Sequence, residues 1–181
     1  MPHKLTTEEM HRLTVEEFRR SAKLPLTVVL DNVRSLNNVG SVFRTADAFR
    51  VEHIALCGIT ATPPHREIHK TALGAEDSVA WSHHADAAEC LQALRVQGCR
   101  IYAVEQVSDS LKLGACGSLL PSGGGGRVAL VLGNELEGVQ ERLLPLCDAS
   151  LEIPQFGTKH SLNVSCAAAI VIWEMYKQMG L

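Results

Sequence analysis

Polar side chains gather where the last predicted helix begins. The polar loop 155–160 leads into a segment that is apolar for most of its length, and Ser161, Asn163 and Ser165 lie at the junction, beside Lys159 and His160. A helix start carries unpaired N–H groups and a partial positive charge. Ser and Asn side chains are common there as caps. Three such side chains next to two basic ones indicate a polar site in addition to a cap.

A second group of candidate residues follows the first predicted strand. Asn38 and Arg44 are six residues apart in the segment 30–49, which is predicted to run from strand through polar turn to helix. Arg44 has apolar neighbours, so we expect it to be partly sheltered. A buried arginine usually has a carboxylate or phosphate partner. Two interpretations therefore stand: a site for a bound phosphate, or an internal salt bridge to Glu135 or Asp47.

A third group follows a strongly apolar strand. The run 128–132 ends in Gly133, and the acidic turn that follows contains Glu135 and closes at Gly138. A glycine at a strand end lets a ligand approach the backbone closely, although an ordinary β-to-α turn would look the same. The run Gly123–Gly126 precedes this strand, whereas a phosphate-binding loop follows one and opens a helix. We therefore interpret the run as a surface connection.

The elements that must position these side chains alternate along the chain. Apolar strands separated by helices are typical of an α/β fold with a mainly parallel sheet covered by helices on both faces. Ligands in such sheets bind outside the carboxyl ends of the strands, which is where the three polar groups fall. The predicted strands are Leu26–Leu30, His53–Cys57, Ser78–Trp81, Arg100–Val104, Val128–Leu132 and Leu151–Ile153. The predicted helices are Thr6–Lys23, Val39–Phe49, a short one after the loop Thr60–Arg66, Ala85–Gln97, Val139–Leu146 and Ser161–Met179.

Composition limits the class of protein. The 181 residues, 46% hydrophobic and 20% charged, suit one globular domain. The net charge of −3 argues against an extensive nucleic-acid-binding surface but allows a local basic patch. The six cysteines form no C-x-x-C pair and have no histidine at zinc-ligand spacing, so we expect reduced thiols and no metal. Without a signal peptide or a membrane-length apolar run, the sequence predicts a cytoplasmic protein.

Taken together, the motifs resemble the SpoU family of RNA 2′-O-ribose methyltransferases, the TrmH-like branch of the SPOUT superfamily. The resemblance covers roughly residues 26–176. It rests on three motifs in the family's order, with a fourth familiar segment between the first two. These are Asn38-x-Gly40-x-x-x-Arg44-Thr45-Ala46, Leu132-Gly133-Asn134-Glu135-x-x-Gly138, Ile153-Pro154 with Ser161-Leu162-Asn163-Val164-Ser165, and Lys70-Thr71-Ala72-x-Gly74-Ala75.

The resemblance implies an architecture. In the family the C-terminal segment threads through a loop and forms a deep trefoil knot, a rare exception among folds. We accordingly expect residues 1–181 to be one methyltransferase domain, with an N-terminal helical extension over 1–24 and a knotted catalytic core over 25–181. The family is dimeric and its active site forms close to the subunit interface, so a homodimer is expected.

The resemblance also implies an activity: methyl transfer from S-adenosyl-L-methionine to a ribose 2′-hydroxyl of tRNA or rRNA. The alternative is a catalytically silent module that binds RNA or the cofactor. By resemblance the polar active-site set is Asn38, Arg44, Glu135, Ser161 and Asn163. The expected cofactor-binding positions are Val104, Glu105, Leu132, Gly133, Asn134, Ile153 and Leu162. The expected RNA-binding side chains are Arg34, Arg44, Arg66, Lys70 and Lys159.

One of these roles stays open. Arg44 matches the family's essential arginine, which has been discussed as the acceptor of the hydroxyl proton. A guanidinium with a pKa above about 12 is a poor base near neutrality. Bidentate contact with a phosphate suits this side chain better. The two roles in sequence, or proton transfer to the phosphate itself, remain alternatives.

Overall fold

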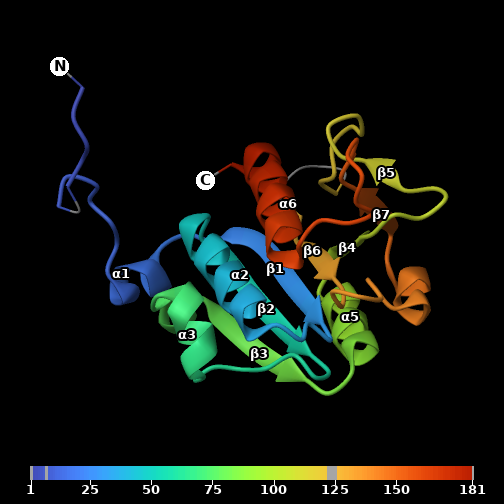
Figure 1. Ribbon diagram of the computed structural model, residues 1–181, viewed down its shortest axis with the longest axis horizontal. Helices are drawn as coiled ribbons and strands as arrows, with labels where there is room; N and C mark the ends of the chain where they lie inside the picture. The colour runs from blue at the N-terminus through green and yellow to red at the C-terminus, as the bar shows by residue number, and fades with distance from the viewer. Residues whose placement is uncertain (1, 7, 122–125, 181) are drawn as a thin grey trace.

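The computed structural model describes residues 2–6, 8–121 and 126–180, and within them seven strands form one parallel sheet (Figure 1). Their order is β3-β2-β1-β6-β4-β7-β5. β2 and β3 lie on one side of β1, and the later strands β4 to β7 lie on its other side. The direction in which strands are added therefore reverses beside β1, which creates a topological switch point. The strands are β1 (Leu24–Asp31), β2 (Val51–Cys57), β3 (Ala80–His84), β4 (Arg100–Val104), β5 (Leu111–Lys112), β6 (Val128–Leu132) and β7 (Ala149–Glu152).

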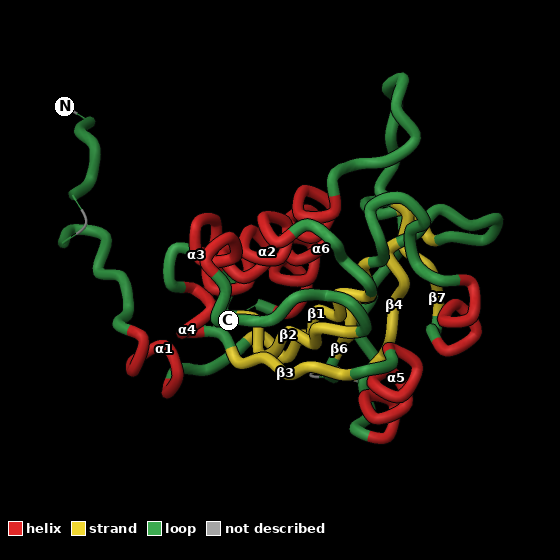
Figure 2. Tube along the Cα trace, turned by 60° about the horizontal axis from the view of Figure 1, so that its bottom comes forward, coloured by secondary structure: helices red, strands yellow, loops and turns green. Residues whose placement is uncertain are grey.

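Helices cover the sheet on both faces. Figure 2 shows α2, α3 and α6 on one side of the strands and α5 on the other. The longest two, α2 and α6, pack against each other. The helices are α1 (Val15–Arg20), α2 (Leu36–Ala48), α3 (Arg66–Ala72), α4 (Ala75–Ser78), α5 (Ala87–Val96), the 3₁₀ helix η1 (Glu141–Leu146) and α6 (Val164–Met179). The prediction of an α/β fold with a mainly parallel, doubly covered sheet is confirmed.

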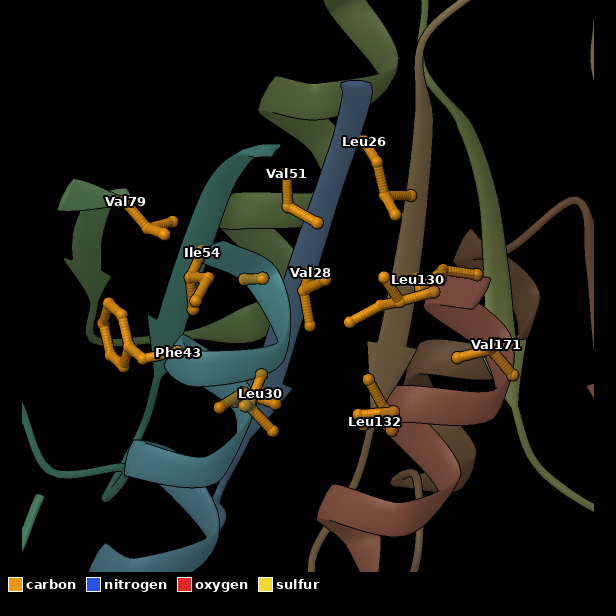
Figure 3. Close-up of a cluster of buried hydrophobic side chains, with 14 of the residues drawn as sticks. Leu26, Val28, Leu30, Phe43, Val51, Ile54, Val79, Leu130, Leu132 and Val171 are labelled. Atoms are coloured by element: carbon orange, nitrogen blue, oxygen red, sulfur yellow. The ribbon is translucent and has the colours of Figure 1, made fainter. Parts of the chain in front are cut away.

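Successive side chains of each strand point to opposite faces of the sheet, and this alternation determines which of them form each core cluster. Val28 and Leu30 of β1 point to the α2 and α6 side, whereas Val29 between them belongs to the cluster under α5. Figure 3 shows the first cluster, where side chains of β1, β2 and β6 meet Phe43 of α2 and Val171 of α6. Because both faces are buried, β1 and β6 need continuous apolar runs, and these runs made them predictable.

The N-terminal helix is much shorter than predicted. Instead of Thr6–Lys23, only Val15–Arg20 is helical, with a capping box between Thr14 and Glu17. Phe18 is the one residue of α1 that is buried. Without an apolar face to bury, the preceding segment lacks the tertiary packing that stabilises most helices in proteins.

Other elements also differ from the predictions. The predicted helix Val139–Leu146 is the 3₁₀ helix η1, which contains Pro145, a residue without an N–H for the α-helical ladder. The segment 75–78 is the short helix α4, so the strand predicted at Ser78–Trp81 is β3, which begins at Ala80. The last helix begins at Val164 rather than Ser161, because Asn163 caps it.

The two-residue strand β5, which pairs with β7, was not predicted, since so short a strand leaves no periodic pattern. Most of the glycine run Gly123–Gly126 lies outside the described residues. Over residues 2–6, 8–121 and 126–180, no helix has the length and apolar character needed to cross a membrane.

Candidate functional site

A cavity of about 460 Å³ opens at the carboxyl ends of three adjacent strands. Val104 at the end of β4, Leu132 at the end of β6 and Ile153 after β7 line it. The loops 133–138 and 160–163 complete its walls. This volume falls in the range of small-molecule sites, and the position is where parallel α/β sheets bind their ligands.

The loop after β6 is held tightly closed. Backbone hydrogen bonds join Asn134 to Gly138 in both directions, at 3.0 and 2.9 Å. A Cβ atom at Gly133 would lie 2.1 Å from the carbonyl carbon and oxygen of Gly138, so only glycine fits there. From the neighbouring strand, Glu105 Oε2 accepts a hydrogen bond from the Val139 N–H at 2.9 Å. The loop therefore presents a fixed backbone wall to the cavity.

A network of carboxylate and amide groups joins the three polar segments. Glu135 Oε1 accepts hydrogen bonds from the Ser35 N–H at 2.9 Å and from Asn38 Nδ2 at 3.0 Å, and Glu135 Oε2 accepts one from the Arg34 N–H at 3.0 Å. Asn163 Nδ2 in turn donates to Asn38 Oδ1 at 3.1 Å. Residues 97 to 125 positions apart along the chain are thereby fixed at the mouth of the cavity.

Asn163 and Ser35 also cap the two helices that meet at this network. The Asn163 side-chain oxygen accepts the Ser165 N–H at 2.9 Å at the start of α6. The Ser35 hydroxyl accepts the Asn38 N–H at 3.3 Å at the start of α2. The Asn163 side chain therefore caps α6 and also takes part in the polar network. The interpretation of this segment as a helix cap and its interpretation as a polar site are both correct.

The Glu135 carboxylate is held in its charged form. Burial raises the pKa of this carboxyl, but the hydrogen bonds from Arg34, Ser35 and Asn38 outweigh burial, and the net pKa lies below its ordinary value. At neutral pH Glu135 is ionised and its oxygens accept backbone donors. It is therefore a structural anchor and a weak proton acceptor.

The cavity is acidic. Its carboxylates come from the end of β4, the loop after β6 and the end of β7, and they are Glu105, Glu135, Glu137 and Glu152. His160 is the one basic side chain among the residues that line the described part of the cavity. Carboxylates in a cleft with low-dielectric walls attract cations. The site thus favours a ligand that carries positive charge.

The structure brings most of the predicted site residues together. All seven predicted cofactor-binding positions line the cavity: Val104, Glu105, Leu132, Gly133, Asn134, Ile153 and Leu162. Of the predicted catalytic residues, Glu135, Ser161 and Asn163 also line it, and Asn38 is one hydrogen bond away.

Arg44 lies apart from this group. It is six residues beyond Asn38 on α2, about 9 Å along the helix axis, and it is exposed. Among the residues that the structure describes, no carboxylate lies within ion-pair distance of Arg44. The prediction that it is partly sheltered is wrong, and neither Glu135 nor Asp47 is its partner. Val42, Phe43 and Ala46 fill the buried face of α2, and the helical period turns Arg44 away from them.

The predicted RNA-binding side chains fall into two places. Arg34 and Lys159 are exposed on the two segments that border the cavity, and the Arg34 backbone contacts Glu135. Arg66 and Lys70 lie on α3, toward the other edge of the sheet, where Lys70 Nζ pairs with Glu67 at 2.7 Å. The two pairs therefore lie on different elements of the chain.

Sequence reasoning missed several polar residues of the cavity, among them Gln106 and Glu152. Gln106 follows β4 and donates from Nε2 to the His160 carbonyl oxygen at 2.9 Å, which ties the loop 155–160 to the strand end. Glu152 at the end of β7 accepts a hydrogen bond from the Ser110 hydroxyl at 2.7 Å. Both follow the rule that ligands bind at strand ends, which was the signal available for finding them.

Beside the site, α6 exposes an apolar face. Phe49 after α2 packs with Trp173 and Tyr176 of α6, with ring centroids 5.4 to 5.6 Å apart. Trp173 is nevertheless 48% exposed, and Ile170 one turn earlier is exposed as well. This exposed surface of Ile170 and Trp173 is called the α6 face below. Contiguous exposed apolar surface commonly marks an interaction site.

The fold and the site define an α/β protein with a cavity at the carboxyl ends of strands β4, β6 and β7 of a parallel sheet. The chain belongs to the SpoU rRNA Methylase family, whose sequence model matches residues 25–173. It is 31% identical over 170 residues to the tRNA (guanosine(18)-2′-O)-methyltransferase of Thermus thermophilus, covering 94% of this chain and 84% of that protein.

Two further comparisons agree. The 23S rRNA (guanosine-2′-O-)-methyltransferase of Xanthomonas axonopodis pv. citri is 29% identical, over 84% of this chain and 59% of that protein. The crystal structure of an AdoMet-bound rRNA methyltransferase from Sinorhizobium meliloti superposes with a TM-score of 0.75 at 27% identity, over 87% of this chain and 61% of that one. The chain therefore spans about three fifths of these two longer relatives.

Proposed function

We propose that this protein is an RNA methyltransferase that moves a methyl group from S-adenosyl-L-methionine to a ribose 2′-hydroxyl of tRNA or rRNA. The observation that carries the proposal is the Asn38–Glu135–Asn163 network, which joins all three family motifs at the mouth of one cavity. The relatives named as guanosine 2′-O-methyltransferases act on tRNA in one case and rRNA in the other, so both substrate classes are retained.

The residues of the cavity fit the cofactor. S-adenosyl-L-methionine carries a sulfonium and an ammonium group, and the cavity offers carboxylates to both, notably Glu105 and Glu152. The closed backbone wall at Gly133, with Ile153 and Leu162, suits the flat adenine ring. When bound, the cofactor supplies a methyl group activated by the positive sulfur. The protein's part is to hold the acceptor hydroxyl in line with that methyl group.

Arg44 is assigned to the RNA. Its exposed guanidinium has the fork geometry for bidentate contact with a phosphate. A guanidinium has five N–H donors and no acceptor, so Arg44 is unsuited to accept the hydroxyl proton. Arg34 and Lys159 flank the cavity mouth and provide further positive charge for the backbone of the same RNA. Ser161 and Asn163 lie at the mouth itself and are assigned to orienting the ribose.

We also propose a homodimer formed through the α6 face. An exposed indole and an exposed isoleucine on adjacent turns bury apolar area on association, which stabilises a contact between copies. Arg44 lies on α2, the helix that packs against α6, so a second copy at this face would lie close to Arg44. A dimer thereby offers a way to bring Arg44 and a cavity together.

The proposed domain organisation is an extension over residues 1–24 that holds α1, followed by a knotted core over 25–181. The course of the chain after β7 supports the knot. From β7, near one edge of the sheet, the segment 153–163 returns so that α6 packs against α2 and β1 (Figure 1). An RNA substrate also favours a cytoplasmic location.

Calorimetry with S-adenosyl-L-methionine tests the cofactor, and transfer of labelled methyl groups to total unmodified RNA tests the reaction. Gly133→Ala should abolish cofactor binding, because its Cβ collides with Gly138 at 2.1 Å. Gly157→Ala is the matched control, since nothing lies within 4 Å of the added Cβ, and it should bind normally. Absence of binding by the wild type at millimolar cofactor would overturn the proposal. Binding without methyl transfer would indicate a catalytically silent member of the family.

A further inference from the structure

The strand β1 ends in a charged side chain that lies outside the cavity. Asp31 is the last residue of β1, is 1% exposed and does not line the cavity. β1 pairs with β6, the strand from which the cavity loop 133–138 departs. A buried carboxylate is costly unless hydrogen-bond donors satisfy its oxygens. The donors around Asp31 therefore indicate what this charge does.

Two side-chain amides supply those donors. Gln140 Nε2 donates to Asp31 Oδ2 at 2.7 Å, and Asn32 Nδ2 donates to Asp31 Oδ1 at 2.9 Å. Burial raises the pKa of the Asp31 carboxyl, while the hydrogen bond from Gln140 and the charge of Arg142 oppose that rise. Because each carboxylate oxygen faces an N–H group, the geometry suits the ionised form of Asp31.

The Gln140 amide is fixed on its other side as well. Its Oε1 accepts a hydrogen bond from Arg142 Nε at 3.0 Å, and the Arg142 guanidinium contacts both Asp86 oxygens, at 2.7 and 3.2 Å. An amide has a donor end and an acceptor end. A carboxylate on one side and a guanidinium on the other therefore permit one orientation of Gln140.

Through Gln140, Asp31 holds the exit of the cavity loop. Gly138 lines the cavity, and Gln140 lies two residues beyond it, where the chain enters η1. Between them, the Val139 N–H donates to Glu105 Oε2. The exit of the loop is thus held from two neighbouring strand ends, by Glu105 inside the cavity and by Asp31 outside it.

Through Asn32, Asp31 also supports the entrance of the loop. Asn134 Nδ2 donates to the Asn32 carbonyl oxygen at 2.9 Å. Asn32 presents that carbonyl from the left-handed region, with φ 55°. Its side chain, which donates to Asp31, also accepts the Ile59 N–H at 3.1 Å. These two bonds hold Asn32 in its unusual conformation, so one buried carboxylate acts on both ends of the loop.

We propose that Asp31 is a positioning residue for the cofactor, which fixes the loop 133–138 in its closed form before the cofactor binds. Because Asp31 does not line the cavity, it acts through Gln140 and Asn32. A wall that is already ordered lowers the cost of binding. The inference rests on the proposed function for the identity of the ligand as S-adenosyl-L-methionine.

Asp31→Asn tests the proposal by separating affinity from turnover. The asparagine has one acceptor oxygen, and its amide nitrogen faces a donor of Gln140 or Asn32. The loop is then closed for a smaller fraction of the time, and the measured affinity falls by that fraction. We expect calorimetry to show about tenfold weaker cofactor binding, the scale of one hydrogen bond to a charged group. Methyl transfer at saturating cofactor should stay within about twofold, because the bound state retains the closed loop.

A second substitution reverses the polarity of the pair and makes the test specific. Gln140→Glu alone places two carboxylates in contact and should also weaken cofactor binding. In the double variant Asp31→Asn/Gln140→Glu, the new amide donates to the new carboxylate, which still accepts from Arg142. The double variant should bind the cofactor within about threefold of the wild type, because contacting residues are non-additive.

Asp148→Asn is the matched control at the amino ends of the strands. Asp148 Oδ2 accepts the Ile101 N–H at 2.7 Å, and Asp148 Oδ1 pairs with Arg95 at 3.3 Å. Its loss should lower the thermal midpoint, as the loss of Asp31 should. Because Asp148 precedes β7 whereas the cavity follows it, cofactor affinity should stay within about twofold, as for independent sites.

Two results would overturn the inference: wild-type cofactor affinity in folded Asp31→Asn, or a double variant that binds no better than Gln140→Glu alone. Thermal melts establish which variants are folded, and the second comparison decides the matter even if Asp31→Asn does not fold. Measurements on the wild type separate this inference from the proposed function. Cofactor binding with the expected pattern of variants but without transfer to RNA contradicts only the assignment of the enzyme. No cofactor binding by the wild type contradicts both.

Discussion

The two ends of α2 differ sharply in how their functional side chains are held. At the N-terminal end, Asn38 is fixed by Glu135 and by Asn163, and the Glu135 carboxylate accepts three hydrogen bonds. Toward the C-terminal end, Arg44 is exposed and has no ion-pair partner in the described residues, and Phe49 leads into the partly exposed aromatic cluster with Trp173. The polar groups of one end are satisfied within the chain, and the other end leaves Arg44 and Trp173 exposed.

This difference separates two tasks. A site whose polar groups are satisfied internally is preorganised, so it can bind a ligand without rearrangement. We propose that the exposed guanidinium of Arg44 and the exposed indole of Trp173 gain their partners on association with RNA and with a second copy. We therefore expect changes at the N-terminal end of α2 to affect cofactor binding and stability, and changes toward its C-terminal end to affect transfer and assembly.

The largest expected effect is that of Arg44→Ala. Methyl transfer at saturating cofactor should fall about a hundred- to a thousandfold, as when a preorganised charge contact is removed from a reacting group. The dissociation constant for the cofactor, measured by calorimetry, should stay within about twofold, because Arg44 does not line the cavity. Arg44→Lys should recover only part of the rate, since lysine cannot make the bidentate contact. A fully active Arg44→Ala variant would show that Arg44 has no role in methyl transfer.

Glu135→Gln should act on the opposite end of α2. The amide has one acceptor oxygen in place of two, so a backbone donor of Arg34 or Ser35 loses its partner. We expect the free energy of unfolding to fall by about 1–3 kcal/mol and the cofactor to bind more weakly. Glu141→Gln, an exposed carboxylate of η1 that does not line the cavity, is the matched control, and denaturant melts with calorimetry measure both. Equal behaviour of the two variants would contradict the anchoring role of Glu135.

Trp173→Ala should weaken self-association. Truncating this ring removes apolar area from the α6 face, at a cost of about 2 kcal/mol or more if the ring lies at the centre of an interface. Sedimentation or light scattering over a range of concentrations should show a shift toward monomer. Val96→Ala, a highly exposed apolar residue on α5, should leave the equilibrium unchanged. A wild-type chain that is monomeric at high concentration would contradict the proposed dimer.

The smallest expected effect is a dependence of stability on pH. Because the pKa of Glu135 is lowered in the folded protein, its contribution is fully present above the ordinary value of 4.5 and is lost as the pH falls through the lower folded value. The difference in unfolding free energy between wild type and Glu135→Gln should therefore shrink below pH 4.5. A difference that stays constant to lower pH would contradict the assigned cause.

The contrast within α2 also explains what the sequence could predict. Strand ends followed by glycine and polar residues located the cavity, because the geometry of a parallel sheet brings such ends together. The environment of Arg44 was predicted wrongly from its neighbours in sequence, although the helical period of Val42, Phe43 and Ala46 already turns it outward. The Glu135 hydrogen bonds join residues that are distant in the chain, so no local pattern encodes them.

The central claim is that the methyl group goes to a ribose oxygen of RNA, and one measurement tests it most directly. RNA is labelled by the wild-type protein with methyl-labelled S-adenosyl-L-methionine and is then hydrolysed in alkali. A methylated 2′-hydroxyl cannot attack the neighbouring phosphate, so the account predicts label in alkali-resistant dinucleotides. Label found only in mononucleotides would place the methyl group on a base and contradict the account.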